Sequence, residues 1–396
     1  MRMDELLKFA PRPTGAGEMF QLLRDGQPRT RSDLATLTGQ ARSTIAARVD
    51  LLLSSGFVTP AGEATSTGGR PPATFAFNPA ARAVLAVDLG ATHARLALTD
   101  LVGTVLAEVG EPIAIAEGPA AVLDRVVALG HGLLETANRP LSDLVSVGVG
   151  LPGPVEHSSG RPINPPIMPG WDDADVPGHL SRRLQHVPVL VDNDVNVMAL
   201  GEHTSQWPTV DHLLFVKVAT GIGAGIISDA QIRRGAQGAA GDLGHIAVPG
   251  GPDLPCRCGN TGCLEALSSG PAIADALRAA GVAASTSADV VALVRAGDPD
   301  ASREVREAGR RIGDVLAACV SMLNPSVIVI GGIVAEAGEQ LLAGIREVVY
   351  RRSLPLATQH LRIVASRTKG RAGVLGASAM ASDHVLSAAA IDALIS

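Results

Sequence analysis

Residues 255–266 read PCRCGNTGCLEA, and they contain three of the four cysteines in this chain, Cys256, Cys258 and Cys263. Three thiols within eight residues are the soft ligands that zinc prefers, and zinc in proteins usually takes four ligands. The nearest good candidate for the fourth is His245, eleven residues upstream in GDLGHIAV. This spacing predicts a closed, structural zinc site. The alternative is a reduced loop without metal.

Three polar side chains, Asp242, His245 and Glu265, lie directly beside the predicted zinc loop. Carboxylates and an imidazole held on such a loop can bind a polyhydroxylated ligand through directed hydrogen bonds. We therefore expect zinc to act indirectly, by holding a loop that shapes a ligand pocket. The fourth cysteine, Cys319, lies in the helical pattern DVLAACVSMLNP and is expected to be a small buried hydrophobe.

Composition sets the size and class of the protein. Of 396 residues, 46% are hydrophobic and 2% aromatic, which predicts two or three domains with aliphatic, alanine-rich cores. Arginine outnumbers lysine 30 to 3, a bias that suits GC-rich coding sequence and gives no evidence for nucleic-acid binding. The sequence has no signal-peptide pattern and no run of 18 apolar residues, which predicts a cytoplasmic protein without a membrane partner. Cysteines in that reducing compartment favour a metal site over disulfides.

The first 82 residues differ from the rest in charge and in pattern. They carry 10 Arg and Lys against 7 Asp and Glu, and the remainder carries 23 against 32, so a mildly basic head precedes an acidic body. AGEMFQLLRDG (residues 16–26) has helical spacing and ends at Gly26. In residues 30–58, Thr30 or Ser32 can cap a second helix, Gly39 makes a turn, and a third helix runs to Gly56. This order is typical of a helix-turn-helix.

The third predicted helix carries the candidate DNA contacts. Side chains early on such a helix reach base edges or phosphates in the major groove, and here these are Arg42, Ser43, Thr44 and Arg48. The alternative is that they are solvated residues on an ordinary three-helix bundle. FVTPAGEATSTGGRPPATFAFNP (residues 57–79) then alternates like a hairpin, with Arg70 near its tip to contact the minor groove or a phosphate, although STGGRPP could be plain linker. Together these parts resemble a winged helix-turn-helix.

The body contains several strand-to-loop transitions with small or acidic residues. AVLAVDLGATHARLALTD (residues 83–100) places Asp88, Gly90 and Thr92 between two strands, where they could hold Mg²⁺ and phosphate or form an ordinary turn. In VPVLVDNDVNVMALGEH (residues 187–203), Asp194 could act as a general base on a hydroxyl that Asn193 positions, or the cluster could cap a helix. Two further glycine turns could approach a phosphate or nucleotide, and their residues are Thr220, Gly221 and Gly223 in the first and Gly331 and Gly332 in the second.

These motifs together resemble the ROK family (repressor, open reading frame, kinase), which groups sugar-responsive repressors with sugar kinases. The most specific element is CRCGNTGCLE with an upstream GxxGH; DLGATHARLALTD, DNDVN, ATGIGAGI and GGIVA follow the family order, and the resemblance covers about residues 16–380. It implies a winged helix-turn-helix (α+β) over residues 1–80, followed by a two-lobed α/β body of the actin/hexokinase-like (ribonuclease H-like) class. The small lobe would span 83–195 with a C-terminal helix at 368–396, and the large lobe with the zinc loop would span 196–367.

The resemblance also implies roles for individual residues. Zinc would be held by His245, Cys256, Cys258 and Cys263, and a sugar by Asn193, Asp194, Asp242, His245 and Glu265. If the protein is a kinase, Asp194 would be the catalytic base. ATP and Mg²⁺ would then lie on degenerate forms of the phosphate loops, at Asp88, Gly90, Thr92, Thr220, Gly221, Gly223, Gly331 and Gly332.

Departures from the family pattern fall mostly in the segments that would bind the nucleotide. Asp242 stands where family kinases have Glu, and Ala91, Ala219 and Ile333 stand where they have glycine. An added Cβ at a close phosphate approach can clash. Because the zinc ligands and most sugar ligands are present while the nucleotide loops are altered, the sequence predicts a sugar sensor with weak or no phosphoryl transfer. Trp171, near the sugar pocket, is equally compatible with a stacking platform and with a core residue.

Three functions follow as hypotheses. The first is a homodimeric or larger repressor that reads a two-fold symmetric operator and releases it on binding sugar. The second is an ATP-dependent sugar kinase, either as the sole function or in a bifunctional regulator that retains slow kinase activity; a kinase alone has no need of the N-terminal head. In the third, the effector of the regulator is a phosphorylated sugar or a protein partner.

Overall fold

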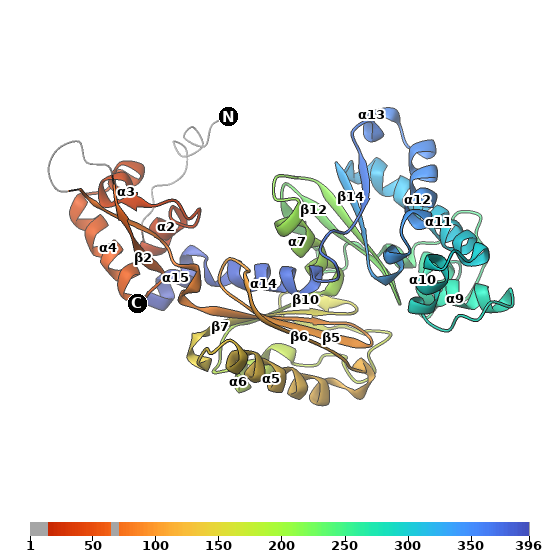
Figure 1. Ribbon diagram of the computed structural model, residues 1–396, viewed down its shortest axis with the longest axis horizontal. Helices are drawn as coiled ribbons and strands as arrows, with labels where there is room; N and C mark the ends of the chain where they lie inside the picture. Colours follow the sequence, from red (N-terminus) through yellow and green to blue (C-terminus); the bar gives the residue numbers. More distant parts are fainter. Residues whose placement is uncertain (1–14, 65–70, 396) are drawn as a thin grey trace.

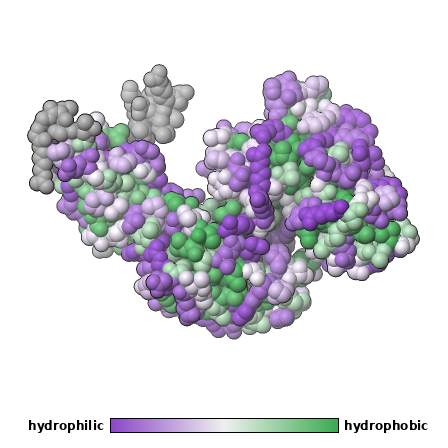
Figure 2. All heavy atoms as spheres, in the orientation of Figure 1, coloured by the Kyte–Doolittle hydropathy of each residue, from purple (hydrophilic) through white to green (hydrophobic). Residues whose placement is uncertain are grey.

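The computed structural model describes residues 15–64 and 71–395, which form a head, a small lobe and a large lobe arranged in a curve (Figure 1). Figure 2 shows open space between the head and the large lobe on one face of the molecule. The predicted DNA contact Arg70 lies outside the described residues.

The head combines short helices with a three-stranded antiparallel sheet of order β1-β3-β2. Its elements are α2 (Ala16–Gln21), β1 (Arg29–Thr30), α3 (Arg31–Thr38), α4 (Arg42–Ser54), β2 (Val58–Glu63) and β3 (Ala73–Phe77). A turn at Gly39, whose φ of 66° lies in the left-handed region, joins α3 to α4. Strands β2 and β3 pair after α4. The head is therefore the predicted winged helix-turn-helix.

Local hydrogen bonding explains where α3 begins. Of the two predicted caps, Thr30 is the one used, because its Oγ1 accepts a hydrogen bond from the backbone N–H of Asp33 at 3.1 Å. In return the Asp33 carboxylate accepts the backbone N–H of Thr30 at 2.9 Å. This reciprocal capping box satisfies two amide groups that the helix itself leaves unpaired.

The core of the head is aromatic, unlike the aliphatic cores expected from the composition. Four of the chain's six phenylalanines, Phe20, Phe57, Phe75 and Phe77, are buried there. The ring of Phe20 meets Phe57 and Phe77 edge-on, with centroids 6.1 and 5.3 Å apart. A domain this small needs large side chains to bury enough apolar area. The predicted apolar face of α4 contributes Ile45, Val49 and Leu52.

The small lobe is a five-stranded sheet of order β10-β7-β4-β5-β6. Its strands are β4 (Ala83–Leu89), β5 (His93–Thr99), β6 (Val105–Pro112), β7 (Leu144–Leu151) and β10 (Val189–Asn193). Strands β4, β5 and β6 form an antiparallel meander, and β7 runs parallel to β4 and β10. Helices α5 (Pro119–Thr136) and α6 (Val176–Arg183) cover one face of this sheet (Figure 1). A short ribbon of β8 (Val155–Glu156) and β9 (Arg161–Pro162) lies beyond β7 in the chain.

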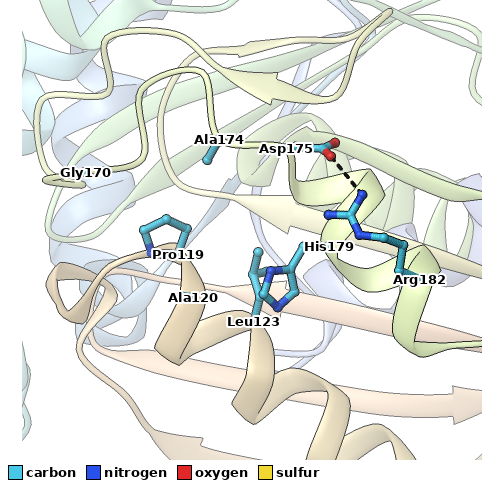
Figure 3. A pocket seen from close by; sticks show the side chains of 8 residues that line it. All are labelled: Pro119, Ala120, Leu123, Gly170, Ala174, Asp175, His179 and Arg182. Carbon is cyan, nitrogen blue, oxygen red and sulfur yellow. Dashed lines mark hydrogen bonds and ion pairs between the residues drawn. The ribbon is translucent and has the colours of Figure 1, made fainter.

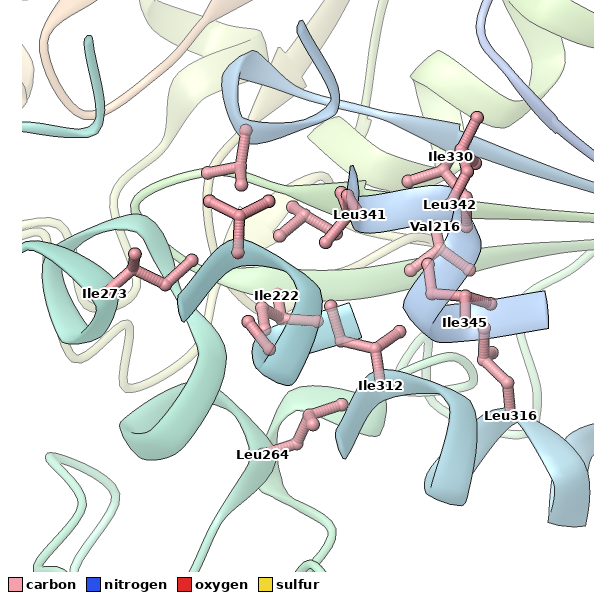
Figure 4. Close-up of a cluster of buried hydrophobic side chains, with 14 of the residues drawn as sticks. Val216, Ile222, Leu264, Ile273, Ile312, Leu316, Ile330, Leu341, Leu342 and Ile345 are labelled. Carbon is pink, nitrogen blue, oxygen red and sulfur yellow. The ribbon is translucent and has the colours of Figure 1, made fainter. Parts of the chain in front are cut away.

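The large lobe repeats the same strand order, β13-β12-β11-β14-β15. Its strands are β11 (Leu213–Val218), β12 (Ile222–Ser228), β13 (Gln231–Arg233), β14 (Val327–Gly331) and β15 (Arg362–Ala365). Its helices are α8 (Leu264–Ser268), α9 (Gly270–Ala279), α10 (Ser287–Arg295), α11 (Pro299–Leu323), α12 (Glu339–Arg352) and α13 (Pro355–Thr358). Apolar side chains of strands and helices meet in an aliphatic core, including Val216, Ile312, Ile330 and Leu341 (Figure 4). Two lobes with one topology make the actin/hexokinase-like α/β body that was predicted.

Two helices, α7 (Asp194–Gln206) and α14 (Ala372–Val385), cross at backbone contact beside the small-lobe sheet. Glycines permit this approach, because a Cβ at Gly376 would lie 1.7 Å from the carbonyl oxygen of Val197. A Cβ at Gly201 would likewise lie 2.0 Å from the carbonyl oxygen of Ala372. Helix α7 also packs on β11 and β12 of the large lobe, so this pair connects both lobes.

The chain ends in α15 (Ala388–Ile395), which packs on α2 of the head. Ile391 is fully buried in the same apolar cluster as Phe20. The backbone N–H of Gly17 donates to the Asp392 carboxylate at 2.7 Å, and Gln21 Nε2 donates to the Leu386 carbonyl at 2.8 Å. The C-terminus of the chain therefore helps to hold the N-terminal head.

Among the described residues, no single helix has both the length and the apolar composition needed to cross a membrane. The consecutive helices α14 and α15, bent by 61°, meet the length and composition criteria only when taken together.

Candidate metal centre and ligand cleft

The four predicted zinc ligands come together in the large lobe. His245 ends a 3₁₀ turn, η4 (Leu243–His245), and Cys263 is the residue immediately before α8. Cys256 and Cys258 lie on a tight loop, in which the Cys256 N–H donates to the Asn260 carbonyl at 2.8 Å. One ligand atom from each of the four residues lies within 4.8 Å of the other three. Loop geometry thus places all four side chains around one point.

The distances suit a tetrahedral metal better than a disulfide. The sulfurs of Cys258 and Cys263 are 3.7 Å apart, and Cys256 Sγ lies 3.6 Å from His245 Nδ1. A disulfide would need about 2.05 Å between sulfurs. A zinc–sulfur bond of about 2.3 Å implies tetrahedral edges of roughly 3.7 Å. The residues present can therefore hold a metal ion of zinc's size and preference.

The thiols differ in how readily they lose a proton. A hydrogen bond from the Asn260 backbone lowers the pKa of Cys258, whereas burial, together with the neighbouring thiols, raises the pKa of Cys263 to about 12. Crowded thiols of this kind cannot all ionise without a counter-charge. A bound cation would supply that charge, and its binding would release protons.

His245 connects the metal centre to the ligand side of the loop. Its Nδ1 faces Cys256, and its Nε2 lies 4.0 Å from the Asp242 carboxylate, whose side chain is 57% exposed. One ring nitrogen is thus directed to the thiols and the other to an exposed acid. This arrangement suits the two predicted roles of the imidazole, which remain predictions.

Glu265 joins the metal loop to the glycine turn between β11 and β12. It lies in the first turn of α8, two residues after Cys263, and its Oε2 accepts the backbone N–H of Ile222 at 3.0 Å. A Cβ at Gly221 would lie 2.7 Å from that oxygen, so the Glu265 side chain would have to shift if residue 221 carried a side chain. The predicted sugar ligand Glu265 and the predicted phosphate-loop residue Gly221 are therefore packed against each other.

At the start of α7 the two predicted ligands behave differently. Asn193 caps the helix, as its Oδ1 accepts the Val195 N–H at 2.9 Å while its Nδ2 donates to the Gly153 carbonyl at 2.7 Å. Asp194 is 3% exposed and does not cap the helix. Its Oδ2 lies 2.5 Å from Nζ of Lys217, a residue that the sequence analysis missed. The available signal was a lone lysine in the apolar strand LLFVKV.

Lys217 stands among several carboxylates. Burial opposes its charge, but Asp194, Asp88 and Glu265 outweigh burial and raise the pKa of Lys217 above its ordinary value. Burial, reinforced by the charge of Asp194, raises the pKa of Asp88, and His93 and Lys217 oppose that rise. These side chains come from β4, α7, β11 and α8, so both lobes contribute to one charged cluster.

The predicted phosphate-loop glycines have close neighbours within the protein. A Cβ at Gly90 would lie 2.1 Å from the His93 ring, and one at Gly331 would lie 2.4 Å from the Phe215 ring. Gly332 has a φ of +83°, and its Cβ would lie 2.5 Å from the Val218 carbonyl oxygen. Internal packing is a sufficient reason for Gly331 and Gly332, whereas the exposed His93 side chain can turn away from a Cβ at residue 90. Of the remaining residues predicted for these loops, Asp88 is buried, Gly223 is half-buried, and Thr92 and Thr220 are exposed.

A second buried charge, also missed from sequence, links the lobes. Asp192 at the end of β10 is 2% exposed, and its Oδ2 lies 2.5 Å from Nε of Arg234, which follows β13. Its Oδ1 accepts hydrogen bonds from the Asn193 backbone and from Asn196 Nδ2, at 2.8 and 2.9 Å. A buried carboxylate needs such partners.

On the head, the predicted DNA contacts begin at the first residue of α4. Arg42 and Ser43 are exposed, and Thr44 and Arg48 are half-buried. Arg48 also hydrogen-bonds Gln40 in the preceding turn. The exposed start of the helix leaves these side chains able to meet a partner.

Two other features are separate from this site. Trp171 is fully buried, and its Nε1 donates to the Ile115 carbonyl at 2.9 Å, so it is a core residue. A hollow of about 270 Å³ lies between α5 and α6 (Figure 3), where Arg182 pairs with Asp175 at 3.3 Å. None of the predicted ligand residues lines that hollow.

Comparison with known proteins identifies the family to which the chain belongs. The ROK family profile matches residues 84–384. A putative xylose repressor from Caldicellulosiruptor sp. (strain Rt8B.4) is 30% identical, over 93% of this chain and 95% of that protein. A solved ROK family transcriptional regulator, a homologue of the E. coli MLC protein, has a TM-score of 0.80 at 27% identity and covers 96% of this chain and 98% of its own. A ROK hexokinase from Thermus thermophilus has a TM-score of 0.64 at 32% identity and covers 76% of this chain and 99% of its own. The chain described here belongs to the ROK family.

Proposed function

We propose that this protein is a sugar-responsive, DNA-binding transcriptional regulator, and specifically a repressor of genes for carbohydrate uptake or metabolism. The observation that carries the proposal is a winged helix-turn-helix joined to a ROK body. The structural match to a ROK regulator extends over 96% of the chain, whereas the hexokinase match covers 76%. The family profile begins at residue 84, just after the head, and a kinase has no need of that head.

The head would read DNA through α4 in the major groove. Arg42, Ser43, Thr44 and Arg48 would contact base edges or phosphates, and Arg70 would contact the neighbouring backbone or minor groove. A homodimer or larger assembly would place two heads on a two-fold symmetric operator. Such a protein would act in the cytoplasm, where its thiols stay reduced.

The effector would bind in the cleft beside the metal centre. Asn193, Asp194, Asp242, His245 and Glu265 would contact sugar hydroxyls, and zinc on His245 and the three cysteines would hold the loop that carries two of them. Xylose is the first sugar to test, because the relative with 30% identity bears the name of a putative xylose repressor. A sugar phosphate or a protein partner is the alternative effector.

Genomic DNA selection tests the proposal directly. The zinc-loaded protein is mixed with genomic fragments, and the bound fragments are sequenced with and without xylose or glucose. A regulator will enrich a palindrome near genes for sugar transport or catabolism, and one sugar will reduce that enrichment. Absence of enrichment under every condition would overturn the proposal.

Two arginine variants distinguish DNA recognition by α4 from a general effect of losing one positive charge. Arg42→Ala removes an exposed arginine at the start of α4, and Arg351→Ala removes an exposed arginine from α12 in the large lobe. Loss of a phosphate or base contact should weaken binding by about 1–3 kcal/mol for Arg42→Ala, and leave Arg351→Ala unchanged. Equal effects would contradict recognition through α4.

A sugar kinase remains the second candidate, because the body matches a ROK hexokinase and Asp194, the proposed base, is buried at the start of α7. Asp194→Asn should abolish phosphorylation by a kinase and leave operator binding of a regulator intact. ATP consumption with each sugar, measured beside operator affinity, distinguishes the two functions.

A further inference from the structure

Beside the proposed sugar ligand Asp194 lies one buried ammonium group whose role the proposed function does not explain. Lys217 on β11 has a side chain that is 18% exposed, and its Nζ lies 2.5 Å from Oδ2 of Asp194, whose side chain is 5% exposed. Both groups are removed from water, so the pair is not an exposed surface salt bridge of the kind that contributes little.

One carboxylate contacts this ammonium, and a second lies close to that carboxylate in the fold. Asp194, the first residue of α7, makes the contact. Asp88 in β4 pairs with Gly150 in β7, and a Cβ at Gly150 would lie 3.5 Å from the Asp194 Cα. Mg²⁺ takes oxygen ligands and is commonly held by one or two carboxylates, so two neighbouring buried carboxylates are a suitable donor set for it. Here the protein fills that position with its own side chain.

Lysine is a rare choice in this chain. Only 3 of its 33 basic residues are lysine, so arginine is the default cation. An ammonium is a compact point charge with three donors, whereas a guanidinium is a wider planar fork that matches one carboxylate. A buried position beside Asp194 and near Asp88 favours the compact group, which accounts for lysine at position 217.

We infer that Lys217 takes the place of a divalent cation between Asp88 and Asp194, and so makes this a sugar-binding cleft without phosphoryl transfer. The inference rests on the proposed sugar-responsive function and identifies a residue that determines it. Lys217 is a positioning residue, since it acts through the carboxylates that it holds.

Two physical consequences follow from a resident ammonium. A second cation entering the gap would be repelled by the first, so Mg²⁺ would not be retained there. A hydroxyl proton moved onto Asp194 would neutralise half of a buried ion pair and leave Lys217 charged without its closest partner, which is costly. Asp194 is therefore engaged by Lys217 and is a poor general base. The His93 ring beside Gly90 further crowds the turn that follows Asp88.

Manganese titration of the zinc-loaded, full-length protein tests this inference, because Mn²⁺ is a spectroscopic probe that accepts the same oxygen ligands as Mg²⁺. Four proteins are compared: the wild type, Lys217→Met, the double variant Lys217→Met with Asp194→Asn, and Lys369→Met. Lys369 is an exposed lysine outside the cluster and serves as the matched control. Bound Mn²⁺ is counted by electron paramagnetic resonance.

Lys217→Met should gain one Mn²⁺ site, at least about tenfold tighter than any in the wild type, and Asp194→Asn should remove it again. Lys369→Met should match the wild type. Equal Mn²⁺ binding by Lys217→Met and the wild type would overturn the inference, as would a gained site that persists in the double variant.

A measurement on the wild type alone keeps the inference testable if Lys217→Met does not fold. Sugar affinity, measured by calorimetry, should be the same with and without millimolar Mg²⁺. A severalfold gain in affinity on adding Mg²⁺ would show that the gap accepts a cation and would overturn the inference. Mn²⁺ counting uses neither operator nor sugar, so its failure is distinguishable from failure of the proposed regulatory function.

Discussion

Two neighbouring arginines, Arg233 and Arg234, make ion pairs in contrasting surroundings. Arg233 pairs with Asp229 at 2.7 Å on the surface, where the two side chains are 46% and 72% exposed. Arg234 pairs with Asp192, which is buried and accepts two further hydrogen bonds at the junction of the lobes. Burial decides which ion pair contributes more to stability, because water screens the Arg233–Asp229 pair more than the Arg234–Asp192 pair.

Removing Arg234 should therefore cost more than removing Arg233. Arg234→Ala leaves a buried carboxylate without its cation and should lower the free energy of unfolding by about 3 kcal/mol. Arg233→Ala should change it by less than about 1 kcal/mol. Urea unfolding of both variants measures the difference, and equal losses would contradict a structural role for the inter-lobe pair.

The contribution of Asp88 to folding stability is expected to change with pH in a definite direction. Its ordinary pKa is 3.8, and burial raises that pKa in the folded state. The folded protein then binds this proton more tightly than the unfolded chain, so the contribution of Asp88 to stability falls as pH rises from 3.8 through the raised pKa. Asp88→Asn should be more stable than the wild type at neutral pH, and the difference should vanish as the pH approaches 3.8.

A second buried aspartate provides the control for this effect. Asp100 accepts the backbone N–H groups of Val102 and Thr104 at 3.0 and 2.8 Å, so its side chain holds the turn between β5 and β6. Asp100→Asn weakens these bonds and should destabilise the protein at neutral pH, opposite to Asp88→Asn. Unfolding curves at several pH values would reject the argument if both variants moved in the same direction.

We expect the folding stability of the large lobe to depend on the metal bound by the cysteine loop. Residues 246–263 connect η4 to α8 without a helix or named strand, and the four ligand side chains of His245 and this loop come together at one centre. Structural zinc commonly supplies much of the folding free energy of such loops. A strong chelator should remove one zinc per chain, lower the melting temperature and abolish sugar binding.

Cys263→Ser is the matching variant, since Cys263 is buried at the start of α8. It should reproduce the effect of the chelator. Cys319→Ser, in a half-buried thiol of α11 outside the cluster, should retain zinc. Zinc content measured by mass spectrometry beside thermal unfolding checks both variants, and full zinc occupancy in Cys263→Ser would contradict the ligand assignment.

Element by element, the sequence predicted what depends on local signals. The capping residue Thr30, the left-handed Gly39 and the cysteine spacing each act within a few residues, so α3, the helix turn and the metal loop could be located. Lys217 could not, because its partner Asp194 is 23 residues away and only the folded lobes bring them together. Trp171 was left open for the same reason, since its partner Ile115 is 56 residues away.

The whole molecule is connected by its two last helices. Helix α14 crosses α7, whose first residue is Asp194, one of the proposed sugar ligands, and α15 follows α14 onto the head. The apolar pattern of 388–395 predicts burial but not the surface that buries it, so this contact with α2 was not foreseen. A continuous run of packed elements now joins the cleft to the DNA-binding helices. It gives a physical basis for the proposed release of operator by sugar.

Gly17 in α2 is the point at which this connection can be tested. A Cβ there would lie 2.0 Å from the backbone oxygen of Ala388, so α15 or α2 must shift in Gly17→Ala, at a cost of about 1–3 kcal/mol. Gly132 in α5 has no neighbouring atom within 4 Å of an added Cβ. Gly132→Ala should instead stabilise its helix by about 0.5–1 kcal/mol, which makes it the matched control.

Coupling between two sites is reciprocal, so one factor must describe how sugar weakens operator binding and how operator weakens sugar binding. In the wild type and in Gly132→Ala, we expect operator affinity to fall on adding sugar and sugar affinity to fall equally on adding operator. Gly17→Ala should keep sugar affinity in the absence of DNA, because the cleft is untouched, while its coupling factor moves toward one. Fluorescence anisotropy of labelled operator and calorimetry of sugar supply the four affinities. An unchanged coupling factor in a variant that is demonstrably destabilised would mean that the α15–α2 contact holds the head without transmitting the state of the cleft.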